Sequence, residues 1–186
     1  VDVYYLPTGC HALESGKTEM ADPFVIVSVR RLTSGADIGD LLTRTLQATQ
    51  FNPQTDGVPR FLLVGNIEEA AYTSAVNLMR LGKADIVILK TPPAFGDMGN
   101  QLLEDIAAYA GCKPITDGIG ARQIDESYVG TIDKIVTSKH ESTLFADNET
   151  QLVRSRVLAI KDQIEAESVD AISEKLKDRV AKLEGK

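Results

Sequence analysis

The sequence predicts an α/β fold with a small, mostly parallel sheet core flanked by helices, an additional β segment and two C-terminal helices. Three short, continuously apolar runs are typical of strands buried on both faces; they lie at 24–29, 61–64 and 86–89. Each run is followed by a segment with the apolar spacing of a helix; these lie at 38–49, 67–81 and 102–110. Alternating strands and helices predict parallel pairing with right-handed crossovers.

Local signals support these first elements. The sequence Asn-Pro-Gln-Thr-Asp-Gly at 52–57 ends the first helix, because the residue before proline and the glycine both disfavour helix. Asn66 is the expected N-cap of the second helix, and Glu68 and Glu69 suit the positive end of its dipole. Residues 8–22, rich in Gly, Ser and charge, predict a loop or hairpin.

The C-terminal part has a different pattern. Two strands are expected at 134–137 and 142–146, on either side of a short polar turn. Asn148 and Gln151 have the spacing of a capping box and predict the start of a long helix. After an interruption at 168–170, apolar residues at helical spacing predict a last helix over 172–183.

Length and charge restrict the class of protein. The chain has 186 residues, about the size of one domain, and carries a net charge of −7, which disfavours nucleic acid and anionic membranes as partners. No apolar run reaches the roughly 20 residues that span a bilayer, and no signal peptide is visible. Two cysteines favour a reducing compartment, so we expect a cytoplasmic protein, or a matrix protein if it is eukaryotic. Val1 in place of a methionine predicts that residues 1–186 are a single domain excised from a longer subunit.

Catalytic and cofactor signals are weak. Cys10, His11, Cys112 and His140 do not have the spacing of a zinc site, and Cys112 is expected to pack as a small apolar side chain. Gly118-Ile119-Gly120 lacks the third glycine of a dinucleotide motif, and no P-loop lysine follows a glycine-rich turn. We therefore assign this chain no catalytic residue, no metal site and no cofactor.

Two helices carry apolar residues on more than one face. In the segment 67–81, Ala70, Ser74 and Leu78 follow one stripe, while Tyr72 and Val76 belong to another. The segment 38–49 has two adjacent leucines that cannot both point straight into the sheet. Either the helices are buried between two layers, or they form a groove that binds other polypeptides through apolar contact.

Several sequence stretches resemble one known family. Residues 90–97 read Lys-Thr-Pro-Pro-Ala-Phe-Gly-Asp, similar to the family's Lys-Ala-Pro-Gly-Phe-Gly-Asp with one residue added. Residues 103–107 are similar to its Leu-Gln-Asp-Ile-Ala, and residues 174–183 to its Glu-Lys-Leu-Gln-Glu-Arg-Val-Ala-Lys-Leu. Over essentially its whole length, the chain resembles the apical domain of a group I chaperonin, the GroEL-type subunit, as a divergent member.

The resemblance implies an ATP-dependent molecular chaperone whose apical domains form the rim of a heptameric ring with sibling subunits. It implies that non-native polypeptides and the mobile loop of a co-chaperonin bind in a groove between helices 38–49 and 67–81. ATP and Mg²⁺ would belong to a domain outside this fragment, which would itself not be an enzyme. By position, the residues implied to bind polypeptide are Tyr4, Leu42, Thr45, Leu46, Ala71, Tyr72, Ala75 and Val76.

Only some of the family's polypeptide-binding residues are matched by the same residue type in this sequence. Whether Thr45 or Leu46 matches the second leucine of the first helix depends on a one-residue shift. Ala71 and Ala75 stand where larger aliphatic residues are usual, and Thr8 and Gly9 replace an aromatic pair. The segment 50–60 is also longer than usual, so the groove is expected in place but less apolar.

Two other functions stay open from the residues alone. One is a small α/β enzyme with a pocket at the carboxyl ends of its strands, where the candidate residues are Asn66, Lys90, Asp97 and Asp117. The other is a scaffold that uses the groove for one fixed partner.

Overall fold

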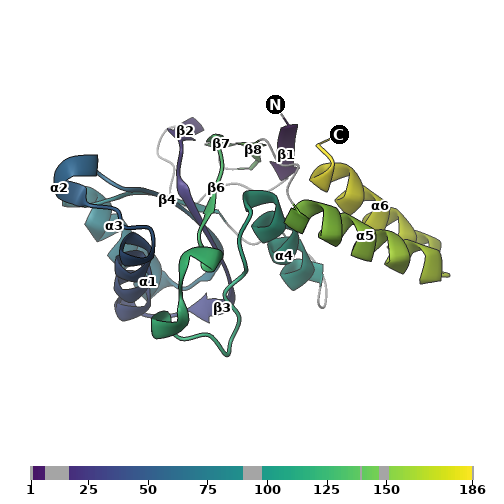
Figure 1. The fold of residues 1–186 in the computed structure, drawn as a ribbon, viewed down its shortest axis with the longest axis horizontal. Helices are drawn as coiled ribbons and strands as arrows, with labels where there is room; N and C mark the ends of the chain where they lie inside the picture. The colour runs from purple at the N-terminus through teal and green to yellow at the C-terminus, as the bar shows by residue number, and fades with distance from the viewer. Residues whose placement is uncertain (1, 7–16, 90–97, 139, 147–150, 186) are drawn as a thin grey trace.

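The computed structural model describes residues 2–6, 17–89, 98–138, 140–146 and 151–185, which form two four-stranded sheets and the helices around them (Figure 1). The parallel core predicted from the sequence is confirmed. It consists of β3 (Phe24–Leu32), β4 (Arg60–Ile67) and β5 (Asp85–Leu89), with the short β6 (Gly130–Thr131) antiparallel to β3. The strand order is β5-β4-β3-β6.

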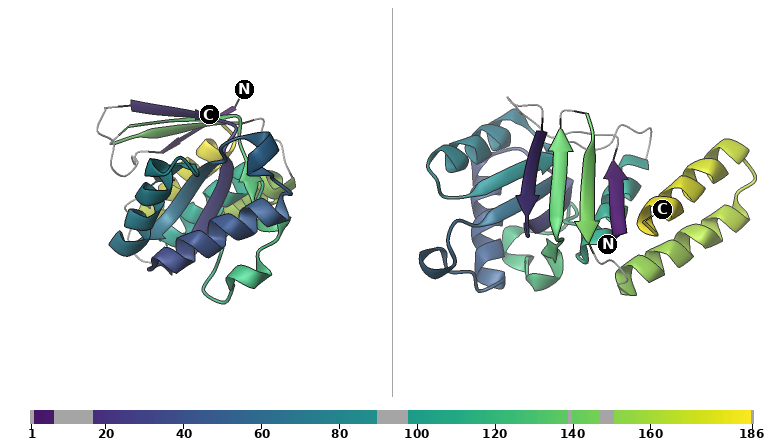
Figure 2. Two further views of the ribbon diagram at one scale, coloured as in Figure 1. Left: turned by 90° about the vertical axis from the view of Figure 1, so that its left-hand side faces the viewer. Right: turned by 90° about the horizontal axis from the view of Figure 1, so that it is seen from above.

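The second sheet is antiparallel and lies as a separate layer over the rest of the molecule (Figure 2). Its order is β1-β8-β7-β2, with bounds β1 (Asp2–Leu6), β2 (Lys17–Ala21), β7 (Lys134–Ser138) and β8 (Ser142–Ala146). The sequence predicted β7 and β8 as the additional β segment, and β2 falls within the expected loop or hairpin. It missed β1, whose partner β8 lies about 140 residues further along the chain.

Six α-helices and two 3₁₀ turns complete the described part of the chain. Their bounds are α1 (Gly35–Ala48), α2 (Pro53–Asp56), α3 (Glu69–Arg80), α4 (Met98–Ala110), η1 (Ala121–Gln123), η2 (Glu126–Tyr128), α5 (Gln151–Ala166) and α6 (Asp170–Leu183). Helices α1, α2 and α3 gather at one end of the molecule, and the α5–α6 hairpin projects from the other end (Figure 1). Asn148, the expected N-cap of α5, lies outside the described residues.

One expected helix start is wrong. Asn66 does not cap α3, because β4 continues through Ile67, which pairs with Leu32 of β3. Glu68 becomes the N-cap residue, and its backbone N–H donates to the Leu32 carbonyl at 2.8 Å. Asn66 and Ile67 belong to β4 because pairing with the neighbouring strand supplies their backbone groups with hydrogen-bond partners.

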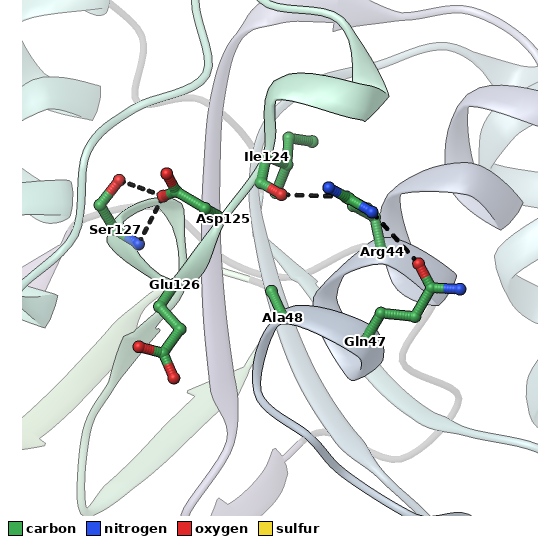
Figure 3. Close-up of a pocket in the computed structure, with 7 residues that line it drawn as sticks. All are labelled: Arg44, Gln47, Ala48, Ile124, Asp125, Glu126 and Ser127. Atoms are coloured by element: carbon green, nitrogen blue, oxygen red, sulfur yellow. Dashed lines mark hydrogen bonds between the residues drawn. The ribbon is translucent and has the colours of Figure 1, made fainter.

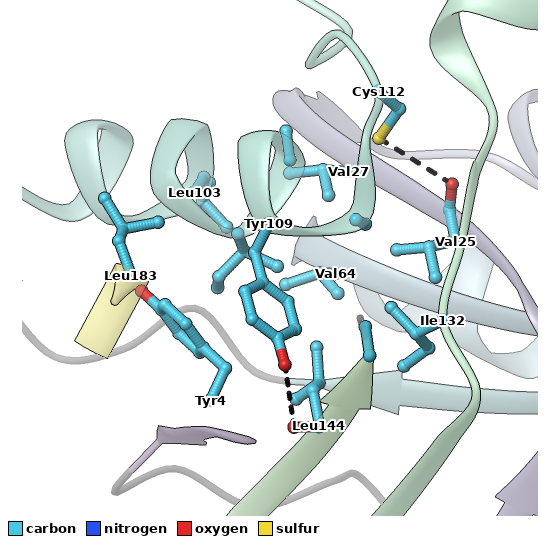
Figure 4. Close-up of a cluster of buried hydrophobic side chains, with 14 of the residues drawn as sticks. Tyr4, Val25, Val27, Val64, Leu103, Tyr109, Cys112, Ile132, Leu144 and Leu183 are labelled. Carbon is cyan, nitrogen blue, oxygen red and sulfur yellow. Dashed lines mark hydrogen bonds between the residues drawn. The ribbon is translucent and has the colours of Figure 1, made fainter. Parts of the chain in front are cut away.

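The parallel sheet divides the core in two, because alternate side chains of each strand point to opposite faces. Val25, Val27 and Val64 belong to the cluster that also contains α4, the second sheet and the α5–α6 hairpin (Figure 4). Ile26 and Leu63 belong to the other cluster, which lies under α1 and α3. Both faces of the sheet are therefore covered, as continuously apolar strands require.

Tyr4 lies in the first cluster. Its side chain is fully buried, with its ring centroid 5.0 Å from that of Tyr109, whose hydroxyl donates to the Leu144 carbonyl at 3.3 Å (Figure 4). Cys112 is 3% exposed in the same cluster, and burial raises the pKa of its thiol to about 12. The expectation that Cys112 packs as a small apolar side chain is confirmed.

A buried carboxylate attaches the C-terminal hairpin to α4. Asp105 is completely buried and accepts from Arg179 Nε at 2.7 Å and from Arg156 Nε at 2.8 Å. Arg179, which is 2% exposed, also donates from Nη1 to Gln101 Oε1 at 2.8 Å. Three helices thus meet at one acidic side chain whose charge is compensated by two guanidinium groups.

Asp105→Asn is expected to destabilise the chain by about 3–5 kcal/mol, because it leaves two arginines without their buried counter-charge. Glu104→Gln is the matched control: Glu104 is 41% exposed and, among the described residues, forms its ion pair with Arg156 at 3.1 Å, so its loss should cost under about 1 kcal/mol. Urea unfolding followed by circular dichroism measures both values. Equal small losses would contradict a central role for Asp105.

Gln50→Gly is expected to stabilise the chain by about 0.5–1 kcal/mol, because Gln50 ends α1 in the left-handed region, at φ 58°. The Phe51 backbone N–H donates to the Leu46 carbonyl at 2.9 Å, the bond that closes this type of helix end. Gln47→Gly, inside the last turn of α1, should instead destabilise. Thermal unfolding of the two variants should therefore shift in opposite directions, and a shared direction would be inconsistent with this account.

Candidate functional site

An apolar hollow of about 490 Å³ lies between α1, α2 and the end of α3. The residues that line it come from three segments of the chain, 39–46, 53–61 and 78–84. They are Gly39, Leu42, Thr43, Leu46, Pro53, Gly57, Val58, Pro59, Phe61, Leu78, Gly82, Lys83 and Ala84. Its size is within the range of pockets that bind compact ligands.

Helix α1 supplies one wall. Gly39, Leu42, Thr43 and Leu46 have the i, i+3, i+4, i+7 spacing of a single helix face. The start of the helix is fixed by a capping box, in which the Asp37 backbone N–H donates to Ser34 Oγ at 3.2 Å. Hydrogen bonds from the Thr33 and Ser34 backbone N–H groups to the carboxylate hold the pKa of Asp37 below its usual range.

The segment 51–59 supplies the second wall. The Phe51 ring packs edge-on against Phe24, with centroids 5.7 Å apart. The Asn52 side chain accepts from the Gln54 backbone N–H at 3.0 Å, and the Asn52 backbone N–H donates to Asp56 Oδ2 at 2.9 Å. The segment 51–59 therefore contains a hydrogen-bonded turn that borders the hollow. Val58, which is 48% exposed, lies on its rim.

The third wall is the end of α3. Near the start of α1 the two helices are in close contact, since a Cβ added at Gly35 would collide with the Ser74 hydroxyl. Further along α1, from Gly39 to Leu46, the hollow separates that helix from Leu78. The apolar space is therefore confined to one end of the helix pair.

The structure brings together only two of the predicted binding residues. Leu42 and Leu46 line the hollow; Leu42 is 5% exposed and Leu46 is half-buried. Tyr72 and Val76 are half-buried on α3 but are not part of the lining.

The other four residues implied to bind polypeptide, Tyr4, Thr45, Ala71 and Ala75, are fully buried in this structure. Thr45 faces the core, and its hydroxyl donates to the Leu41 carbonyl at 2.8 Å. Ala71 and Ala75 lie on the sheet-facing side of α3, in the cluster that contains Ile26 and Leu63. Their small size is thus a packing requirement on the inner face of the helix.

Sequence reasoning missed most of the lining. Val58, Pro59, Gly82 and Lys83 follow the ends of helices, and no periodic pattern relates them to α1. The Gly39–Leu46 spacing and the unusual length of the segment 50–60 were the available signals.

A second pocket, of about 500 Å³, lies on another side of α1 and is polar (Figure 3). Arg44 Nε donates to the Ile124 carbonyl at 3.1 Å, and Arg44 Nη1 to Gln47 Oε1 at 3.4 Å. Asp125 accepts from the Ser127 backbone N–H at 2.8 Å and from the Ser127 hydroxyl. The Arg44–Ile124 bond fastens the loop that carries η1 and η2 to α1, and the Asp125–Ser127 bonds lie within that loop, so the polar groups here serve the fold.

Two of the residues considered for an enzyme are described. Asn66 is half-buried within β4, and Asp117 is exposed in the loop before η1. Lys90 and Asp97, like Cys10 and His11, lie outside the described residues. Over the described ranges, no three His, Cys, Asp or Glu side chains gather as a metal site would require. No helix in the described part of the chain is both long and apolar enough to span a bilayer.

Comparison with known proteins was made by sequence and by fold. No family model matches the chain. It is 30% identical over 175 residues to the mitochondrial chaperonin HSP60 of Trypanosoma cruzi, an alignment that covers 91% of this chain and 30% of the relative.

The fold matches the chaperonin gp146 from the bacteriophage EL 2 (Pseudomonas aeruginosa), solved in two crystal forms in the presence of ATP-BeFx. The TM-scores are 0.74 and 0.71 at 17% identity, over 98% and 97% of this chain and 36% of gp146. The chain thus spans about a third of the length of the chaperonins it matches. Sequence and fold together identify it as a GroEL-type chaperonin domain.

Proposed function

We propose that this chain is the polypeptide-binding, apical domain of a chaperonin subunit and that the α1–α3 hollow captures exposed apolar segments of non-native proteins. The observation that carries the proposal is the apolar hollow itself, formed between the two helices that the family resemblance implies. Chaperonin homology supports the general chaperone role.

The energetics favour weak capture by a single domain. Each aliphatic or aromatic side chain that becomes fully buried contributes roughly 1.5–3 kcal/mol. Much of that is offset by the loss of translational freedom and by ordering of the bound segment. Identical domains in a ring would raise the avidity, because a client held at one site meets the next at high local concentration.

The remaining partners follow from the family and belong to the same proposal. A co-chaperonin mobile loop would compete with clients for the hollow, and sibling subunits would form the ring. ATP and Mg²⁺ would act in parts of the subunit outside this chain, which itself would need no cofactor and catalyse no reaction. The expected location is the cytoplasm or an organelle matrix.

Leu46→Glu is expected to weaken binding of a permanently unfolded client at least tenfold, because it places a charge against the apolar lining. Fluorescence anisotropy with labelled, reduced and carboxymethylated α-lactalbumin measures the affinity. Leu158→Glu is the matched control: Leu158 is 65% exposed on α5, at the other end of the molecule, and its replacement should leave binding unchanged.

Val76→Glu tests whether clients bind instead on the side of α3 that is not part of the hollow. Loss of binding in Val76→Glu with normal binding in Leu46→Glu would move the site away from the hollow. A panel of several unfolded proteins separates a general chaperone from a scaffold, since a scaffold would bind at most one of them.

A further inference from the structure

We propose that the open edge of β2 is a second binding site, at which an extended stretch of a non-native polypeptide pairs through its main chain. This site is separate from the hollow, since the two share no described lining residue. The inference rests on the proposed function, because non-native polypeptide is the ligand of both sites. It is carried by the hydrogen-bond pattern of β2 and by the cleft along the outer side of that strand.

Strand β2 ends the second sheet and has β7 as its one neighbour among the described strands. The Asp22 N–H donates to the Asp133 carbonyl at 2.8 Å, and bonded pairs in an antiparallel ladder recur at every second residue. Met20 therefore also bonds to β7, whereas the N–H and C=O groups of Glu19 and Ala21 point away from it. On that outer side, these groups form no main-chain hydrogen bond within the described part of the chain.

A cleft of about 390 Å³ runs along this outer side. Four consecutive residues of β2, 18–21, line the cleft, although their side chains alternate between the two faces of the sheet. The cleft therefore follows the edge of the strand. Its opposite wall consists of Arg60, Met79 and the start of β5, 85–87. Figure 2 shows β2 as the strand of the second sheet nearest to α1 and α3.

An extended polypeptide is the ligand that matches such an edge. The free N–H and C=O groups of β2 recur at every second residue, about 7 Å apart at 3.4 Å per residue, and a second strand has the same repeat. A strand that adds to a sheet edge gains its affinity from main-chain hydrogen bonds, while side-chain pockets supply the selectivity. The edge of β2 can therefore bind segments of different sequence.

The side chains around the cleft also favour a varied ligand. Two of the three methionines of the chain, Met20 and Met79, line it, and methionine adapts its shape at surfaces that bind many partners. Glu19, Arg60 and Asp85 are exposed there and supply charge of both signs. A second copy of the chain fits less well, because antiparallel self-pairing about the centre of β2 places Glu19 opposite its own copy.

The first test removes hydrogen-bond donors from the ligand. Three labelled peptides share one alternating valine and threonine sequence flanked by lysines; one is unmodified, one is N-methylated at the valines and one at the threonines. The two sets of amides lie on opposite edges of an extended strand, so only one set faces β2. Fluorescence anisotropy should show that one methylated peptide binds at least fivefold more weakly than the unmodified peptide, and that the other stays within twofold of it. Equal affinities of all three would overturn main-chain pairing.

The second test removes a donor from the chain. Ala21→Pro deletes an outward N–H, which the edge of a sheet tolerates, and should weaken binding of the unmodified peptide at least threefold. Ala21→Val keeps the N–H and is the matched control, which should bind as the wild-type chain does. Hydrogen exchange followed by NMR examines the same edge without any substitution. The amides of Glu19 and Ala21 should exchange more slowly once the unmodified peptide is bound, and unchanged exchange at both would overturn the site.

The outcomes separate this inference from the proposed function. The Leu46→Glu variant should still show slower exchange at the two amides with the peptide bound, because the hollow takes no part in edge pairing. Capture of unfolded α-lactalbumin through Leu46, with both amides unprotected by client and peptide, would overturn the edge site alone. Slow exchange that depends on the concentration of the chain, without any peptide, would place a second copy on the edge and overturn the ligand proposed here. Failure of α-lactalbumin to bind at all would instead overturn the proposed function.

Discussion

The three parallel strands are apolar on both faces, and the rest of the structure depends on covering them. Ile26 and Leu63 point to one side of the sheet, and Val25 and Val64 point to the other. Right-handed crossovers place α1 and α3, which follow β3 and β4, beside each other on the first face. Two neighbouring helices on one sheet necessarily leave a furrow between them. The candidate site is thus a consequence of how the sheet is covered.

The opposite face is covered by segments that are distant in sequence, and this explains why the buried charges lie there. The second sheet joins β1 to β8, and the α5–α6 hairpin joins α4 through Asp105. Apolar contact alone would tolerate several positions of such a hairpin, whereas a carboxylate between Arg156 and Arg179 has one satisfactory geometry. One face of the sheet therefore carries the specific structural attachments, which leaves the other free to present the hollow.

The sequence predicted most local elements well, because β3 to β5 are continuously apolar and α1, α3 and α4 show the helical period. It did not predict α2, a single turn within the stretch 52–57 that was expected to disfavour helix. It missed β1, since a five-residue strand is recognisable only through its remote partner. The family resemblance implies a site between α1 and α3, and two of its residues, Leu42 and Leu46, line the hollow there. An apolar helix does not by itself reveal which of its sides is covered. Ala71 and Ala75 therefore proved to be core residues, and Lys83 joined the site through tertiary contact alone.

Small residues in the helix pair determine where binding surface remains. Ala71 and Ala75 let α3 lie close to the sheet. Gly35 lets α1 contact α3 at Ser74. Close packing at that end leaves no room for a ligand, so the apolar space is displaced toward Leu46 and the segment 51–59. A hollow confined in this way offers little area, and affinity that cannot come from area must come from fit and from charge at the rim. If the proposed capture of apolar segments takes place here, a hollow confined in this way accepts a narrower range of segments than an open groove would.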